Sequence, residues 1–126
     1  MSFEADLKAH LQGASAISNV VADRITPVIR QQGAVAPAIT YQIVTTDQIS
    51  HLAGRSDTLR HIRLQIDMWS RDHSEVMTLA TAVRARMDTA AATFRSVLLP
   101  AGFDDYEPDT KLYRRSLEFS CWFNET

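Results

Sequence analysis

Four histidines, one cysteine and an acidic segment are the residues of this sequence whose chemistry is most adaptable. No two histidines have the spacing of a zinc-binding motif; they are His10, His51, His61 and His73. Cys121 falls among the apolar positions of an alternating pattern, which favours a small buried hydrophobe over a nucleophile. The acidic segment 104–109 does not match an EF-hand loop, and a solvated turn is the simpler interpretation.

Glycine-rich motifs do not add a site to this picture. The sequence contains no GxGxxG, no phosphate-binding loop and no nucleophile elbow, and its four glycines are isolated. We therefore expect neither an enzyme nor a bound cofactor or metal ion.

The composition is that of one ordinary globular domain, and we expect a single domain over residues 1–126. The chain has 126 residues, 45% of them hydrophobic and 22% charged, with a formal net charge of −2. Such a balance lacks the basic footprint of a nucleic-acid-binding protein. Apolar runs are far shorter than a membrane span, the start is unlike a signal peptide, and the lone cysteine suits a reducing compartment. These features predict a soluble protein made in a cytoplasm.

Two regions have the spacing of amphipathic helices. Apolar residues recur every fourth position from Phe3 to Leu11, and Gly13 then predicts the end of a short helix. A further helical turn is expected within residues 14–21. The stronger pattern begins at Asp72, a candidate cap, with Glu75 placed to complete a capping box. Its apolar stripe consists of Val76, Leu79, Ala80, Val83, Met87 and Ala90.

Three runs alternate between apolar and polar residues, as strands do when one face is buried. They cover residues 39–44, 60–69 and 113–124, and a short strand is expected near Arg24 and Ile25. Arg115 is the one charged residue on the apolar side of the last run. The order helix, strand, strand, helix, strand predicts an α+β fold with two layers: a mainly antiparallel sheet with two helices packed on one face.

Both tryptophans, Trp69 and Trp122, fall in the register of the polar residues, as do His61 and Arg63. Two interpretations remain open at this level. Either the rings lie on the sheet surface away from the helices and anchor an interface, or a bulge near each strand end turns them inward.

The segment from Asp47 to Leu59 is long for a hairpin connection, and such loops are often functional or disordered. It is either a loop that orders on contact with a partner or a floppy hairpin tip. Together with the polar sheet face it supplies the candidate assembly-interface residues: Trp69, Trp122, Arg63, His61, Ile49, Leu52 and Arg55.

Taken in order along the chain, these motifs resemble the phage tail completion or tail terminator family of long-tailed phages, prophages and gene transfer agents. The resemblance begins with a helix carrying Leu7 and Leu11, followed by Val20 to Pro27 and the proline-led strand Pro37 to Tyr41. It continues through Arg63 to Trp69 and the Ala- and Arg-rich helix Ser74 to Met87, and it ends with Tyr106 to Thr110 and the aromatic residues after it. The specificity lies in the combination and order of these short motifs.

The resemblance implies a structural virion protein that caps the end of the tail tube as a ring, usually a hexamer. Such a ring stops tube polymerisation and mediates the joining of head and tail at the tail–neck junction, after assembly in the host cytoplasm. The implied partners are copies of the chain itself, the tail tube protein and a neck or connector protein, while DNA passes through the lumen without sequence-specific binding. A head-to-tail interface that closes on itself builds such a ring.

Two alternatives stay open. One is another neck component, such as a head-closure adaptor. The other is a ferredoxin-like domain that binds a small ligand or acts as a cofactor-free oxygenase; it predicts a closed apolar pocket with Arg115 inside, whereas the simpler view is an arginine that reaches out to solvent.

Overall fold

The structure is a computed structural model, and it describes residues 3–27, 36–48, 59–89, 91, 94–100 and 102–124. These ranges contain three helices and six strands. The helices are α1 (Phe3–Gln12), α2 (Ser15–Val21) and α3 (His73–Met87). The strands are β1 (Ile25–Pro27), β2 (Ala38–Gln48), β3 (Leu59–Ser70), β4 (Phe94–Leu98), β5 (Phe103–Glu107) and β6 (Leu112–Asn124).

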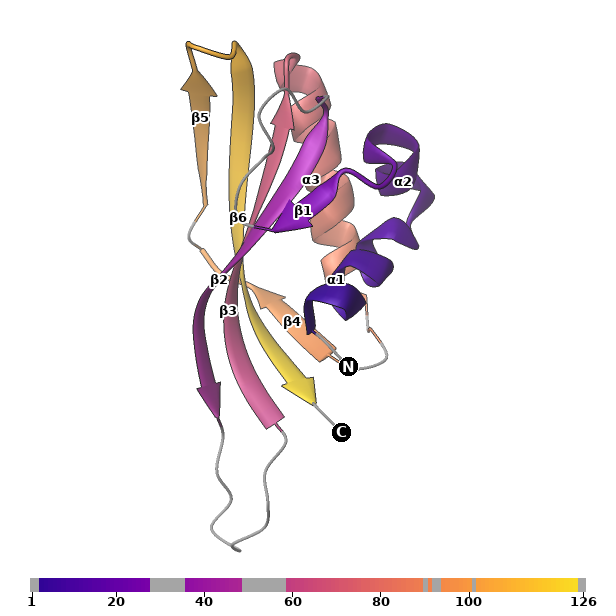
Figure 1. The fold of residues 1–126 in the computed structure, drawn as a ribbon, viewed down its shortest axis with the longest axis vertical. Helices are drawn as coiled ribbons and strands as arrows, with labels where there is room; N and C mark the ends of the chain where they lie inside the picture. The colour runs from indigo at the N-terminus through magenta and orange to yellow at the C-terminus, as the bar shows by residue number, and fades with distance from the viewer. Residues whose placement is uncertain are drawn as a thin grey trace, which may run out of the picture.

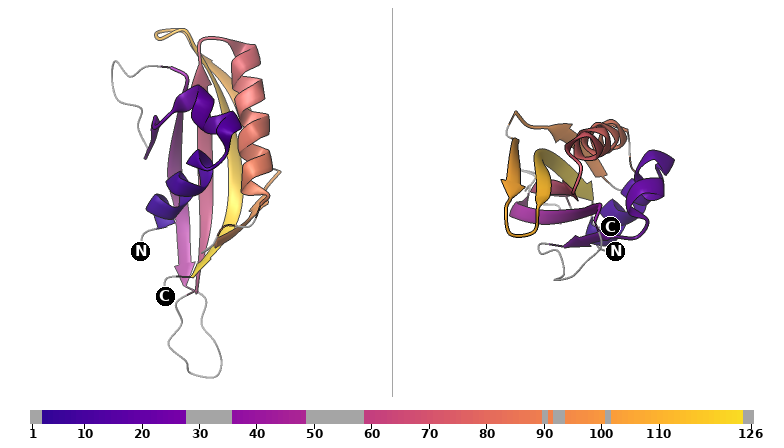
Figure 2. Two further views of the ribbon diagram at one scale, coloured as in Figure 1. Left: turned by 90° about the vertical axis from the view of Figure 1, so that its right-hand side faces the viewer. Right: turned by 90° about the horizontal axis from the view of Figure 1, so that it is seen from above.

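The helices pack on one side of a single sheet, so the α+β prediction is confirmed (Figures 1 and 2). The strands are ordered β1-β2-β3-β6-β4, with β5 also paired to β6. The finer prediction is met only roughly. The described helices number three rather than two, since residues 15–21, where only a helical turn was expected, form α2 with Ile17 and Val21 buried. The sheet is mainly antiparallel, and its one parallel pairing among the described strands joins β1 to β2.

Helix α1 ends where the sequence predicts, and its glycine has a tertiary reason. Phe3, Leu7 and Leu11 are buried, and the N–H of Gly13 donates to the carbonyl of Ala9 at 3.0 Å. A Cβ on Gly13 would approach the Nη2 atom of Arg86 to 2.5 Å. Gly13 therefore leaves room for the guanidinium of Arg86, which donates to the His10 carbonyl at 2.6 Å.

The start of α3 uses the predicted cap in a different arrangement. The carboxylate of Asp72 accepts a hydrogen bond from the N–H of Ser74 at 3.1 Å, as a helix cap should. The predicted capping box does not form, because the Ser70 hydroxyl at the end of β3 donates to Glu75 at 2.6 Å and draws that carboxylate away. The predicted stripe is buried from Val76 to Met87; Ala90 lies outside the described residues.

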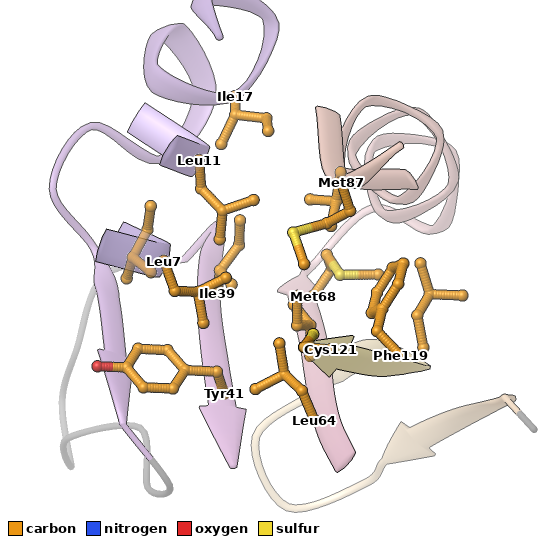
Figure 3. Packing of buried hydrophobic residues seen from close by; sticks show 14 of the residues in the cluster. Leu7, Leu11, Ile17, Ile39, Tyr41, Leu64, Met68, Met87, Phe119 and Cys121 are labelled. Carbon is orange, nitrogen blue, oxygen red and sulfur yellow. The ribbon is translucent and has the colours of Figure 1, made fainter. Parts of the chain in front are cut away.

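Strands β3 and β6 form the centre of the sheet and carry most of its buried face. Their antiparallel pairing is continuous from Leu59–Asn124 to Ser70–Tyr113. Leu64, Met68, Phe119 and Cys121 on these strands meet residues from the helices in the core (Figure 3). The β2–β3 pairing shifts by one residue between Ile43 and Thr45, which marks a β-bulge at Val44.

Strands β4 and β5 lie one after the other along the same edge of β6, and the sequence patterns did not reveal either of them. β4 pairs with residues 119–123 of β6 and β5 with residues 112–116. Gly102 joins the two where the chain passes close to β6, since a Cβ there would lie 2.6 Å from the Ser116 carbonyl oxygen.

The prediction that residues 104–109 form a solvated turn was wrong for its first half, since residues 103–107 are strand and the turn occupies residues 108–111. Two arginines of β6 explain why an acidic segment becomes a strand. Arg114 pairs with Asp105 at 3.0 Å and Arg115 with Asp104 at 3.4 Å. Opposite charges facing each other across neighbouring strands stabilise their pairing.

Within the described ranges, none of the helices has both the length and the apolar character needed to cross a membrane.

Candidate assembly surface on the open sheet face

The side of the sheet turned away from the helices is here called the open face. It consists of alternate residues of each strand, because the residues between them are buried beneath the helices. On β3 and β6 it carries His61, Arg63, Gln65, Asp67, Trp69, Arg114, Ser116, Glu118, Ser120 and Trp122.

Both tryptophans belong to the open face, in the register that the sequence predicts. The β3–β6 pairing has no register shift, so no bulge turns either ring toward the core. Each side chain is half-buried. Trp122 lies opposite His61, eight residues before Trp69 on β3, so the rings are separated by about 26 Å of strand. The tryptophans therefore belong to two clusters at opposite ends of the face.

The first cluster surrounds Trp69. Its indole N–H donates to the hydroxyl of Thr40 on β2 at 3.0 Å. The guanidinium of Arg114 lies 5.2 Å from the centre of the Trp69 ring and 5.1 Å from that of Phe103 on β5. A cation between two aromatic faces is attracted by both rings. This Trp69 cluster thus draws together side chains from four strands.

Ion pairs hold the same arginine in place. Arg114 contacts Asp105 at 3.0 Å and Asp67 at 3.7 Å. The side chain of Asp67 is only 13% exposed, and its carboxylate also accepts hydrogen bonds from the Gln65 amide at 3.2 and 3.3 Å. We therefore count Asp67, Asp105 and Arg114 with Trp69, Thr40 and Phe103 in the Trp69 cluster.

The second cluster, called the Trp122 cluster, consists of His61, Ser120 and Trp122. The rings of His61 and Trp122 lie 5.0 Å apart between their centres. The Nε2 atom of His61 is hydrogen-bonded to the Ser120 hydroxyl. Arg95 of β4 is paired with Trp122 across the two neighbouring strands. This cluster joins neighbouring strands by ring contact and one hydrogen bond.

Of the predicted interface residues that the structure describes, His61 and Trp122 lie together. Arg63 lies between the two clusters, where it pairs with Glu118 at 3.2 Å and keeps 46% of its side chain exposed. Trp69 is at the far end. Ile49, Leu52 and Arg55 lie outside the described residues.

The sequence-based interpretation missed two exposed apolar residues of this face. Val97 on β4 is 56% exposed and Phe103 on β5 is 50% exposed. They pair in register with Ser120 and Ser116, which places them on the open face. Neither strand alternates cleanly, since Leu98 follows Val97 and two aspartates follow Phe103, and each strand has only five residues.

Burial shifts the pKa of two side chains that could take part in chemistry, Cys121 and His10. Burial raises the pKa of the Cys121 thiol to about 12, so it is not a thiolate at neutral pH. Burial, followed by smaller effects that include nearby Arg86, lowers the pKa of His10, whose Nε2 contacts the Arg86 carbonyl at 2.9 Å. Among the residues that the structure describes, no three histidine, cysteine or acidic side chains are grouped to hold a metal ion.

The helix-covered side has two hollows beside α3, and they bear on the ligand-binding alternative. One, of about 380 Å³, lies over Leu98 and Phe119, and the other, of about 370 Å³, includes Arg115 in its lining. The exposed Arg84 lines both of them, so they open to solvent rather than form a closed pocket. Arg115 reaches Asp104 at 3.4 Å with 32% of its side chain exposed, as expected for an arginine that extends outward.

The fold and its open face define a small α+β protein with one helix-covered and one accessible sheet face. Comparison with protein families is more specific: residues 5–124 match the model of the family described as tail completion protein gp17. The chain belongs to this family, a family of structural virion tail proteins.

A solved structure shares the fold over nearly the whole chain. A chain of the structure titled "Virion of native gene transfer agent (GTA) particle" superposes with a TM-score of 0.67 at 13% sequence identity. The match covers 98% of this chain and 95% of that one. A comparison with curated protein sequences finds no match.

Proposed function

We propose that this protein is a tail terminator: copies of the chain form a ring, most simply a hexamer, that caps the finished tail tube. The ring stops tube polymerisation and joins the tail to a neck or connector protein at the tail–neck junction, after assembly in the host cytoplasm. The observation that carries the proposal is the family match over residues 5–124. The likeness to a chain of a gene transfer agent virion supports a place in a particle of phage type.

The charge of the chain is compatible with a ring through which DNA passes. The formal net charge is −2. On the open face, Arg63 and Arg114 are each paired with a carboxylate, and Arg95 donates to the Ala91 carbonyl at 3.0 Å. Since unspecific DNA binding depends on basic side chains that neutralise phosphates, we expect little retention of DNA.

We also propose that the open face is an assembly surface, with Trp122, His61, Arg63 and Trp69 as its contacts and Ile49, Leu52 and Arg55 contributing from the segment beyond β2. Half-buried aromatic rings offer a partner a large contact area at a small loss of conformational entropy. Arg63, with 46% of its side chain exposed, is accessible for a polar contact.

The experiment mixes the purified protein with the tail tube protein of the same particle under conditions in which tubes assemble. Electron microscopy should show ring-shaped density at one tube end, and the mean tube length should fall as the protein is added. Tubes that bind the protein along their sides, or not at all, would contradict the terminator role. Binding to a neck protein without binding to tubes would favour the head-closure alternative.

For the open face, Trp122→Ala and Trp69→Ala should weaken binding to the tube or neck protein more than they lower the melting temperature. Arg71→Ala is the matched control, because Arg71 is exposed and lies between β3 and α3, outside the open face. If both tryptophan variants unfold the isolated protein outright, the rings are structural and the open face is not the contact.

A further inference from the structure

Two strand edges lie at the same level of the sheet. Thr45 of β2 pairs with Arg63 of β3, Arg63 pairs with Ser120 of β6, and Ser120 pairs with Val97 of β4. One row of paired residues therefore crosses these four strands. In this row β2 and β4 are the outermost of the described strands. At the other end of the sheet both edges are covered, by β1 next to residues 39–41 and by β5 next to residues 112–116. Figure 1 shows β4 beside one end of β6 and β5 beside the other.

The edge of β4 presents backbone groups without a partner among the described residues. The N–H of Leu99 donates to the carbonyl of Glu118 at 2.9 Å, so this residue turns its backbone toward β6. Because these groups alternate along an antiparallel strand, Ser96 and Leu98 turn theirs outward. β4 is the last strand in the sheet order. An open strand edge of this kind is a template for pairing with another chain.

Residues 42–48 of β2 are here called its free half, because the pairing with β1 ends at Tyr41. The N–H of Ile39 points outward to the carbonyl of Arg24 at 2.9 Å. The one-residue shift between Ile43 and Thr45 moves the outward position to Thr46. In the part of the chain that the structure describes, residues 42–48 pair only with β3.

Exposed apolar side chains accompany both edges. Four large apolar residues of the described surface are exposed: Val44, Val97, Phe103 and Tyr106. Val97 lies on β4 at 56% exposure, and Val44 lies on the free half of β2 at 42%. Exposed apolar groups beside an open edge favour burial against a partner.

We propose that copies of this chain join edge to edge, with β4 of one copy paired to the free half of β2 of the next. This inference rests on the proposed ring and names the contact that closes it. Three antiparallel pairings separate β2 from β4, so the two strands run in opposite directions within one copy. Copies arranged around an axis along the strands keep their strand directions, and β4 therefore meets the next β2 as an antiparallel neighbour.

The lengths and the symmetry agree with this contact. β4 has five residues, and the free half of β2 spans residues 42–48. The two edges differ from each other, as a head-to-tail interface requires, and each copy carries one of each. Pairing through the edges leaves the open face of every copy available for the tube or neck protein.

Proline substitutions at the outward positions test the contact. Ser96→Pro and Thr46→Pro each remove one outward N–H while the hydrogen bonds to the inner neighbour strand remain. Ser96→Ala and Thr46→Ala are the matched controls. Ser96→Ala loses the same hydroxyl, which donates to the Met87 carbonyl at 2.6 Å, but keeps the N–H. In sedimentation velocity we expect each proline variant to associate at least about tenfold more weakly than its control.

Mixing the two proline variants gives the sharpest result. Ser96→Pro leaves the β2 edge intact, and Thr46→Pro leaves the β4 edge intact. One intact edge of each kind can pair in the mixture, so it should form one-to-one heterodimers and no larger assembly. Rings that form equally well from the proline variants would overturn the edge pairing and leave the terminator proposal intact. A wild-type protein that stays monomeric even at tube ends would overturn the ring itself.

Hydrogen exchange on the unmodified protein covers the case in which a proline variant does not fold. The amides of Ser96, Leu98 and Thr46 should exchange at least about tenfold more slowly in the assembled form than in the dilute monomer. The amide of Leu99 is already bonded to Glu118 and serves as the internal control. Equal exchange of Ser96, Leu98 and Thr46 in both forms would contradict the edge contact.

Discussion

The two ends of the open face are held in different ways. Around Trp69, Arg114 is paired with two carboxylates and lies against two aromatic rings, and the sheet edges there are covered by β1 and β5. Around Trp122, the indole ring lies against the ring of His61, whose Nε2 atom is hydrogen-bonded to the Ser120 hydroxyl. The strand edges at that level, on β2 and β4, are open among the described residues.

This difference bears on stability. Interactions inside the chain hold the Trp69 end together and cover its strand edges, so its side chains contribute to folding as well as to the open face. The Trp122 end offers an exposed Val97 and, among the described residues, backbone groups of β4 without a partner, which another chain can bury. We therefore expect substitutions at the Trp69 end to lower the free energy of unfolding more than substitutions at the Trp122 end.

The largest expected effect on folding belongs to Arg114. Arg114→Ala leaves Asp67, only 13% exposed, without its cation and removes the contacts with Trp69 and Phe103. We expect a loss of about 2–3 kcal/mol in the free energy of unfolding, measured by urea denaturation. Arg63→Ala, which removes one ion pair and no aromatic contact from a side chain that is 46% exposed, should cost less, about 0.5–1 kcal/mol. Equal losses would show that the Trp69 cluster adds no stability beyond that of a single ion pair.

A smaller effect is expected from replacing each indole by a benzene ring. Trp69→Phe removes the hydrogen bond to the hydroxyl of Thr40, a residue that is only 2% exposed. The free energy of unfolding should fall by about 1 kcal/mol. Trp122→Phe keeps the ring contact with His61 and should cost only about 0.3 kcal/mol. Thermal unfolding monitored by circular dichroism measures both. A larger loss for Trp122→Phe would reverse the comparison.

The smallest effect concerns local opening, for which Cys121 is a built-in probe. Cys121 is fully buried, pairs with Ser96 of β4 and precedes Trp122. Its pKa of about 12 makes the folded thiol unreactive at pH 8, so labelling reports opening. If Trp122→Ala weakens this end by about 1 kcal/mol, labelling should become about fivefold faster. Trp69→Phe should leave the rate nearly unchanged; equal acceleration by both variants would mean that Cys121 is exposed only by global unfolding.

Much of the fold was predictable from local patterns. The alternation from Arg60 to Trp69 and the spacing from Val76 to Met87 identified a strand and a helix correctly, because both periods are properties of the backbone itself. The strand Phe94–Leu98 was missed because five residues give too little alternation to recognise. The strand Phe103–Glu107 was missed because its carboxylates are unfavourable in a strand until Arg114 and Arg115 face them.

The candidate site was predictable only in part. The sequence placed Trp69, Trp122, His61 and Arg63 on one face, and the structure agrees. Arg114 stood in the same alternating pattern, yet its role depends on Asp67, Phe103 and Asp105 from two other strands. A single sequence does not show which strands become neighbours, so these contacts were out of reach.

By itself the sequence determined which side of the sheet each residue of β3 and β6 occupies, since alternation along a strand needs no partner. Only the tertiary structure decided that the tryptophans lie at opposite ends of the face and that the two open edges share one level. Those facts depend on strand order and register, which arise from contacts between segments far apart in the chain.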